Sequence, residues 1–196
     1  MAVATEFLGS RDGHSSAERQ AERVSVVIPT HNRADLIGQA IESVLAQTAR
    51  PGEVIVVDDR SDDGTAKVLD AFGDAIQVIR TSTNVERGSA RNLGARAAAG
   101  ELLAFLDSDD AWEPGKLRAQ VTAHKHPSVT GLRFVDVRGV PVGTYLPPAR
   151  NTQMLTIENH CLGAPSSLLL PRVAFDEVGG FPRPVTIRAP RTGCSW

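Results

Sequence analysis

The sequence has few cysteines and no long hydrophobic run. Its 196 residues include two cysteines, Cys161 and Cys194, which are far apart and form no metal-binding pair. We expect both to be free thiols of a reducing compartment, and hence a cytoplasmic protein. No stretch approaches the roughly 18 unbroken apolar residues of a transmembrane segment. Residues 1–22 are polar and lack the apolar centre of a signal peptide, so we expect a flexible leader.

An excess of positive charge is also missing. The chain has 21 Lys and Arg residues against 23 Asp and Glu residues, which gives a formal net charge of −2. Proteins that wrap nucleic acid usually carry a clear basic excess, so we do not expect nucleic acid as a partner. Peripheral association with a membrane stays open. The length fits one domain with a sizeable core.

The chain does contain a regular alternation of short apolar runs and amphipathic segments. Buried strands are predicted at 24–28, 53–57, 76–79, 102–106 and 166–170. Helices are predicted at 34–47, from 65 onward (capped by Asp62 or Asp63), at 89–99, 114–124 and 173–178. This alternation indicates an α/β fold with a predominantly parallel sheet covered by helices on both faces. We place the domain at 23–181 and predict an irregular tail at 182–196.

Acidic residues gather where two of these strands end. Asp58 and Asp59 follow the second strand, and Asp107, Asp109 and Asp110 follow the fourth. Ligands of open parallel sheets bind outside the carboxyl ends of the strands, so topology places both clusters in one crevice. Three carboxylates within four residues repel one another unless a cation neutralises them, and Mn²⁺ or Mg²⁺ suits such oxygens and shares its coordination with phosphates. We predict a metal at Asp107, Asp109 and Asp110; the alternative is a solvated turn in which Asp109 or Asp110 caps the next helix.

Further polar residues are expected to line the same crevice. The segment Thr30-His-Asn32 follows the first strand, and we assign no chemistry to His31. Arg87 and Arg91 flank Gly88 near the predicted start of a helix, where guanidinium groups and N–H groups attract anions. Contact with a pyrophosphate is one interpretation, and an ion pair with a nearby aspartate is the other for either arginine.

Four segments, in this order and spacing, resemble the family-two glycosyltransferases. They are Val24-Ser-Val-Val-Ile-Pro-Thr-His-Asn-Arg33, Val56-Val-Asp-Asp-Arg-Ser-Asp-Asp-Gly-Thr65, Gly88-Ser-Ala-Arg-Asn-Leu-Gly-Ala95 and Gly100-Glu-Leu-Leu-Ala-Phe-Leu-Asp-Ser-Asp-Asp110. The resemblance covers roughly residues 24–125 and resumes at 166–181, where Val178-Gly-Gly-Phe181 resembles a later element of the family. It implies the GT-A fold and metal-assisted transfer of a sugar, with inversion, from a nucleoside diphosphate sugar, often UDP-linked, to an acceptor hydroxyl or amine.

The resemblance also implies roles for single residues. By motif position, Pro29, Thr30 and Asp59 would contact the nucleoside. Asp109 and Asp110 would lie at the ribose, diphosphate and metal, with Asp107 beside them, and the metal would act as a Lewis acid on the departing diphosphate. The predicted donor-binding set is Pro29, Thr30, Asn32, Asp58, Asp59, Arg87, Gly88, Arg91, Asp107, Ser108 and Asp109.

One element of the family is missing from the sequence. The family usually places an acidic general base some way after the Gly-Gly-Phe element, but no Asp or Glu follows Phe181. A general base typically contributes a factor of about 100 to 10,000 in rate. We therefore hypothesise a truncated chain with a replaced tail, for example after a reading-frame shift, which the other frames of the encoding DNA would test. The distant substitutes are Asp136, Glu158, Asp176 and Glu177, and no spacing favours one of them.

Three other interpretations compete with this one. A non-catalytic or degenerate nucleotide-sugar binder would share the fold and the donor site and differ only in turnover. A receiver-type signalling domain would need a lone aspartate after a middle strand and a lysine after a late one, a pattern that this chain lacks. A dinucleotide-binding fold would need G-x-G-x-x-G after the first strand, where Pro29-Thr-His31 stands.

Overall fold

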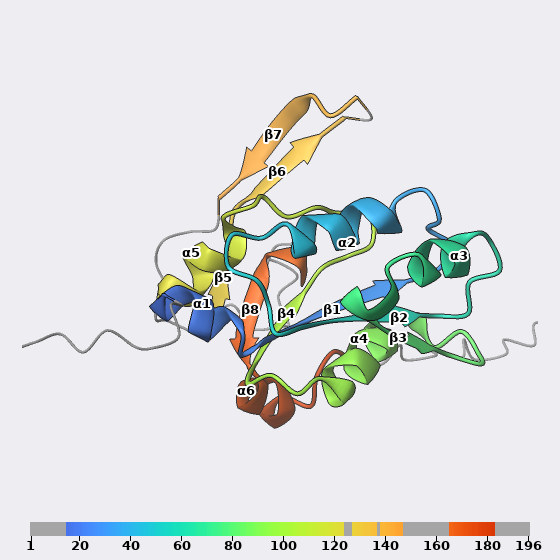
Figure 1. The fold of residues 1–196 in the computed structure, drawn as a ribbon, viewed down its shortest axis with the longest axis horizontal. Helices are drawn as coiled ribbons and strands as arrows, with labels where there is room; N and C mark the ends of the chain where they lie inside the picture. Colours follow the sequence, from blue (N-terminus) through green and yellow to red (C-terminus); the bar gives the residue numbers. More distant parts are fainter. Residues whose placement is uncertain (1–14, 124–126, 137, 147–164, 183–196) are drawn as a thin grey trace, which may run out of the picture.

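The centre of the protein is a six-stranded sheet in the order β3-β2-β1-β4-β8-β5. The structure is a computed structural model that describes residues 15–123, 127–136, 138–146 and 165–182 (Figure 1). The strands of the sheet are β1 Val24–Thr30, β2 Glu53–Asp58, β3 Gln77–Arg80, β4 Leu102–Phe105, β5 Ser128–Val129 and β8 Leu168–Pro171. The first four are mutually parallel, whereas β8 runs antiparallel to both β4 and β5. The predicted α/β fold with a predominantly parallel sheet is therefore confirmed.

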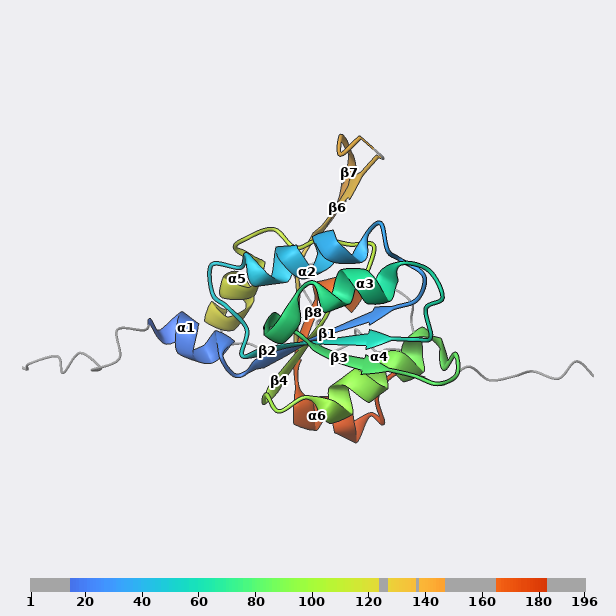
Figure 2. The ribbon, with the colours of Figure 1, turned by 45° about the vertical axis from the view of Figure 1, so that its right-hand side comes forward.

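Helices cover both faces of the sheet. They are α1 Ser16–Ala21, α2 Ile37–Leu45, α3 Thr65–Asp70, α4 Glu86–Ala97, α5 Lys116–Thr122 and α6 Arg172–Glu177, with short 3-10 turns at Gly73–Ala75 and Pro165–Ser167. Figures 1 and 2 show α2, α3 and α5 on one face and α4 and α6 on the other. Within the described ranges, no helix has the length and apolar content needed to cross a bilayer.

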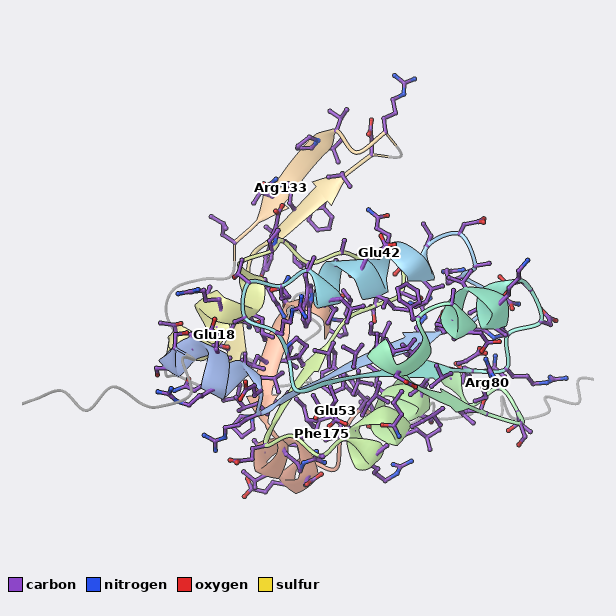
Figure 3. The ribbon with its side chains drawn as sticks, in the orientation of Figure 1. Glu18, Glu42, Glu53, Arg80, Arg133 and Phe175 are labelled. Atoms are coloured by element: carbon purple, nitrogen blue, oxygen red, sulfur yellow. The ribbon has the colours of Figure 1, made fainter. Side chains whose placement is uncertain are left out.

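The alternation of side chains along β1 explains the two layers of core. All seven residues of β1 are buried. Val24, Val26 and Ile28 belong to the cluster beneath α2, whereas Val27 belongs to the cluster beneath α4 and α6. Phe175 of α6, labelled in Figure 3, packs in this second cluster with its ring centroid 5.6 Å from that of Phe105. A strand that is apolar on both faces is what a parallel sheet between two helical layers requires.

Several elements differ from the sequence prediction. Helix α2 begins at Ile37 rather than at residue 34, and the N-cap of α3 is Gly64 rather than the predicted Asp62 or Asp63. Helix α4 begins at Glu86 rather than at residue 89, because the Asp59 carboxylate accepts hydrogen bonds from the N–H groups that open it. Residues 15–22, expected within a flexible leader, include α1, which opens with a capping box between Ser15 and Glu18 and packs against α5. Both cysteines and residues 183–196 lie outside the described residues.

A hairpin projects from the body of the fold (Figures 1 and 2). It consists of β6 Leu132–Val135 and β7 Pro141–Tyr145. Its exposed apolar side chains, each at least 53% exposed, are Phe134, Val135, Val140, Val142 and Leu146. Arg133 of β6 (Figure 3) forms an ion pair with Glu113.

Candidate functional site

A pocket of about 290 Å³ lies at the carboxyl ends of β1, β2 and β4. Parallel strands bring their carboxyl ends to one edge of the sheet, and Thr30 pairs with Asp58 across β1 and β2. The lining residues are Pro29, Thr30, His31, Asn32, Arg33, Asp59, Asn84, Glu86, Arg87, Ala90, Asp107, Ser108 and Asp109. Of the eleven residues predicted to bind the donor, eight line this pocket; Asp58, Gly88 and Arg91 do not.

Asp59 shapes the pocket through its carboxylate. This side chain is 4% exposed and accepts hydrogen bonds from the N–H of Val85 (2.8 Å), the N–H of Glu86 (3.0 Å) and the hydroxyl of Thr81 (2.9 Å). The first two bonds satisfy N–H groups at the start of α4, which has no partner for them within the helix. Asp59 therefore acts as a helix cap, and it leaves little acceptor capacity for a nucleoside.

Asp58 and Arg91 lie behind the pocket wall and have structural partners. The carboxylate of Asp58 is buried and accepts a hydrogen bond from the N–H of Ser61 at 3.0 Å. Arg91 forms an ion pair with Asp107, which matches the ion-pair interpretation rather than contact with a pyrophosphate. Arg87, one turn earlier on α4, is exposed and lines the pocket instead.

The three aspartates that follow β4 face different partners. One oxygen of Asp107 is held by Arg91, and one oxygen of Asp110 accepts the hydroxyl hydrogen of Ser166. Burial raises the pKa of Asp110, the hydrogen bond from Ser166 opposes this, and the neighbouring carboxylates of Asp107 and Asp109 add to the rise. In the part of the chain that the structure describes, no three His, Cys, Asp or Glu side chains are arranged to hold a metal ion. The alternative in which Asp109 or Asp110 caps the next helix is not seen either, since α5 begins at Lys116 without a side-chain cap.

One or two carboxylate ligands from the protein are nevertheless enough for a metal ion that also binds a phosphate. Asp107 and Asp109 both line the pocket, and Asp109 is exposed there, whereas Asp110 does not line it. Mg²⁺ is usually bound through one or two carboxylates plus substrate phosphates rather than by a cage of protein ligands alone. Asp107 and Asp109 are therefore suited to bind such a metal ion together with a diphosphate.

Backbone strain concentrates around the pocket. Among the described residues other than glycine, the positive φ angles are those of Asn32 (51°), Arg60 (58°) and Glu86 (71°). Asn32 and Glu86 line the pocket, and Arg60 directly follows Asp59. The side chain of Asn32 accepts a hydrogen bond from the N–H of Asp62 at 2.9 Å, which stabilises this conformation. Strained backbone of this kind clusters at functional sites.

Several pocket residues were missing from the predicted set. His31 lines the pocket, and its Nδ1 lies 2.6 Å from the carbonyl oxygen of Asp59. Asn84 and Glu86 reach the pocket because the cap by Asp59 draws the start of α4 toward it. The hydroxyl of Thr30, a predicted residue, is buried without a partner among the described residues. The sequence predicted that helix α4 begins at residue 89, so it gave no signal that Asn84 and Glu86 lie at the pocket.

None of the three distant substitutes for a general base that the structure describes lines the pocket. Asp136 accepts hydrogen bonds from the N–H groups of Arg138 and Val140 in the turn of the hairpin. Asp176 and Glu177 are exposed on α6, and Glu158 lies outside the described residues. The pocket acids are instead Asp59, Glu86, Asp107 and Asp109.

Comparison with known proteins gives a consistent picture. Residues 25–171 match the model of "Glycosyl transferase family 2". The chain is 35% identical over 130 residues to the putative teichuronic acid biosynthesis glycosyltransferase TuaG of Bacillus subtilis, covering 63% of this chain and 52% of the relative. It is 30% identical over 145 residues to the UDP-Glc:alpha-D-GlcNAc-diphosphoundecaprenol beta-1,3-glucosyltransferase WfgD of Escherichia coli, covering 71% and 57%. The chain thus spans about half the length of these relatives.

Solved structures agree on the fold. S. aureus TarS 1-349 in complex with UDP superposes with a TM-score of 0.64 at 25% identity, covering 81% of this chain and 50% of that one. The mannosyltransferase PcManGT from Pyrobaculum calidifontis, in complex with GDP-Man and Mn²⁺, has a TM-score of 0.58 at 21% identity, covering 82% and 47%. The mostly parallel sheet between helical layers is the GT-A fold. On the match over residues 25–171, together with the pocket at the strand ends, the chain belongs to glycosyl transferase family 2, a family of enzymes.

Proposed function

We propose that this protein transfers a sugar from a UDP-linked donor to an acceptor hydroxyl or amine with inversion at the anomeric carbon. The observation that carries the proposal is the pocket, which joins the ends of β1 and β2, the start of α4 and the acidic loop after β4. These parts offer hydrogen-bonding groups, positive charge and carboxylates, as a nucleoside diphosphate bound with a metal requires. The UDP complex of TarS and the UDP-glucose donor in the name of WfgD support uridine as the base.

The residues divide between the two ends of the donor. Pro29, Thr30 and the side chain of Asn32 line the pocket at the end of β1, where we place the nucleoside. Arg87 lies in the first turn of α4 and lines the pocket, where its exposed guanidinium attracts the diphosphate. Ser108 lines the pocket beside the acidic loop.

Asp107 and Asp109 are the proposed protein ligands of a Mn²⁺ or Mg²⁺ ion. The three-carboxylate site predicted from the sequence is thereby reduced to two carboxylates that share the ion with the diphosphate. When bound, such an ion stabilises the negative charge on the departing diphosphate. The acceptor then attacks the anomeric carbon from the face opposite the diphosphate. The bond to the diphosphate oxygen breaks as the bond to the acceptor forms, and the acceptor releases its proton.

A second candidate function is donor binding without turnover. It is favoured by one observation, namely that Asp136, Asp176 and Glu177, the described substitutes for the general base, do not line the pocket. We also propose a cytoplasmic location, as the cysteine content led us to expect. We assign no particular acceptor to the enzyme. Release of UDP from UDP-sugars in the presence of candidate acceptors separates the transferase from the binder.

Calorimetric titration of UDP into the protein, with and without Mn²⁺, tests the donor site. We expect binding that depends on Mn²⁺ and that weakens in Asp109→Ala by about tenfold or more, because a ligand of the ion is lost. Asp74→Ala, which removes an exposed aspartate of the turn Gly73–Ala75, is the matched control and should bind like the wild type. Absence of UDP binding by the folded wild type would overturn the proposal.

A further inference from the structure

Ser166 lies against the acidic loop although it is 56 residues beyond Asp110 in the chain. Because β8 runs antiparallel to β4, the residues before β8 lie at the carboxyl end of β4, next to the site. We propose that Ser166 is a positioning residue that holds Asp110 out of the pocket and orients the Asp107–Asp110 turn so that Asp109 faces the donor. This inference rests on the proposed function and adds a residue outside the predicted donor-binding and metal-binding sets.

The hydroxyl of Ser166 ties together both ends of the acidic turn. Its oxygen accepts a hydrogen bond from the N–H of Asp107 at 3.0 Å and donates to Oδ2 of Asp110 at 2.5 Å. The turn itself is closed by the N–H of Asp110, which donates to the carbonyl of Asp107 at 3.0 Å. One hydroxyl thus fixes the backbone at the start of the turn and the side chain at its end.

Ser166 is itself firmly held. Its carbonyl accepts a hydrogen bond from the indole Nε1–H of Trp112 at 2.8 Å. The carbonyl of the adjacent Ser167 accepts from Nε2 of Gln120 at 3.0 Å and from the N–H of Thr130 at 3.1 Å. Ser166 is 5% exposed and Ser167 is 1% exposed, so solvent does not compete for these bonds. A buried, multiply anchored residue can impose a conformation on the loop beside it.

The three aspartates therefore differ in their hydrogen-bond and ion-pair partners. Asp107 is held by Arg91 and Asp110 by Ser166, whereas the carboxylate of Asp109 has no protein partner among the described residues. Of these three aspartates, only Asp109 is exposed at the pocket with both oxygens available. Groups that orient a metal ligand from behind typically change metal affinity by 10–100-fold when they are removed.

The test compares Ser166→Ala with Ser25→Ala. Ser25 is the matched control because its buried hydroxyl also accepts from a backbone N–H, that of Gly100, and donates to a carboxylate, that of Glu53, but at the opposite edge of the sheet. UDP affinity is measured by calorimetry with Mn²⁺ and again with EDTA. We expect Ser166→Ala to weaken the Mn²⁺-dependent binding by 10–100-fold and to leave metal-free binding unchanged. Ser166→Thr, which keeps the hydroxyl, should restore the Mn²⁺-dependent binding, and Ser25→Ala should leave both affinities unchanged.

A readout without ligand separates this inference from the proposed function. Amide hydrogen exchange of a peptide covering residues 106–112 should become faster in Ser166→Ala and stay unchanged in Ser25→Ala, since only the first variant removes the acceptor of the Asp107 N–H. If the wild type binds no UDP, the proposed function fails and the metal-related role of Ser166 fails with it. If the wild type binds UDP with Mn²⁺ and Ser166→Ala binds it equally well, the positioning role alone is overturned. Equal exchange in the two variants would overturn it as well.

Discussion

Arg91 and Asp107 form an ion pair that joins α4 to the end of β4, with only 9% and 17% of their side chains exposed. The guanidinium carbon of Arg91 also lies 5.1 Å from the ring centroid of Phe181, within reach of a cation–π interaction. Phe181 is fixed in turn by two hydrogen bonds between its backbone and the side chain of Asn92. Three segments distant in the sequence therefore meet at one guanidinium group behind the donor pocket.

Breaking this ion pair should destabilise the protein. We expect Arg91→Met to lower the free energy of unfolding by about 3 kcal/mol, because it leaves the largely buried carboxylate of Asp107 unpaired. The double variant Arg91→Met, Asp107→Leu should lose less than the single variant, since no unpaired charge remains. Urea denaturation measures both. Arg23→Met is the control, because the Arg23–Glu101 pair is 55% and 67% exposed and should contribute little; a loss as large as that of Arg91→Met would contradict the prediction.

Asp59 should stabilise the start of α4. Asp59→Ala removes the acceptor for the N–H groups of Val85 and Glu86 and for the hydroxyl of Thr81. We expect the free energy of unfolding to fall by about 3 kcal/mol and UDP affinity to fall with it, because the pocket wall formed by α4 loosens. Urea denaturation followed by circular dichroism, together with calorimetry, gives the two values. Asp62→Ala, at an exposed aspartate three residues on, should change neither; equal behaviour of the two variants would refute the capping role.

Gly94 allows α4 to approach the sheet. A Cβ at this position would overlap Val27 of β1 and lie 3.1 Å from Cγ2 of Val57 of β2. Gly94→Ala should therefore cost about 1–3 kcal/mol of stability, although alanine favours a helix. Gly38→Ala in α2 is the converse case, because the nearest atom would be 3.7 Å away, and it should gain up to about 1 kcal/mol. The midpoint temperatures of thermal unfolding of the two variants should shift in opposite directions. A higher midpoint for Gly94→Ala would exclude the close approach of α4 to the sheet.

Lys116 should make stability depend on pH. Burial holds its pKa well below the ordinary value, and its ammonium nitrogen has no hydrogen-bond partner among the described residues. The nitrogen lies over the Trp112 ring, 3.6 Å from the ring centroid. This contact favours the charged form but replaces only part of the lost hydration. The unfolded chain keeps the proton up to about pH 10.4, whereas the folded chain releases it at lower pH.

The free energy of unfolding should therefore rise with pH between the pKa of Lys116 in the folded chain and its pKa in the unfolded chain. In this range the unfolded state binds more protons than the folded state. Lys116→Met should stabilise the protein by about 1 kcal/mol at pH 7, and this gain should shrink as the pH approaches 10.4. Urea denaturation of both proteins at a series of pH values checks this. If the gain in free energy of unfolding from Lys116→Met stays constant with pH, the titration of Lys116 does not contribute to the pH dependence of stability.

Much of the fold and of the donor pocket follows from local sequence patterns. The apolar run of β1 and the helical spacing of α2 predicted their elements, since side-chain periodicity reflects burial over a few residues. The polar residues that end parallel strands were correctly placed in one crevice, because strand polarity alone brings Thr30, Asp59 and Asp109 to the same edge.

The roles of individual charges depended on the tertiary structure. Nothing within four residues of Asp107 or Asp110 shows that Arg91 holds the first and Ser166 the second, 16 and 56 residues away in the chain. The same holds for Asp59, whose carboxylate caps a helix that begins 27 residues later. A sequence pattern records which side chains reach an edge of the sheet. The antiparallel β8 and the packing of α4 against β1 and β2 then decide which carboxylates are neutralised by the protein and which one is exposed at the pocket.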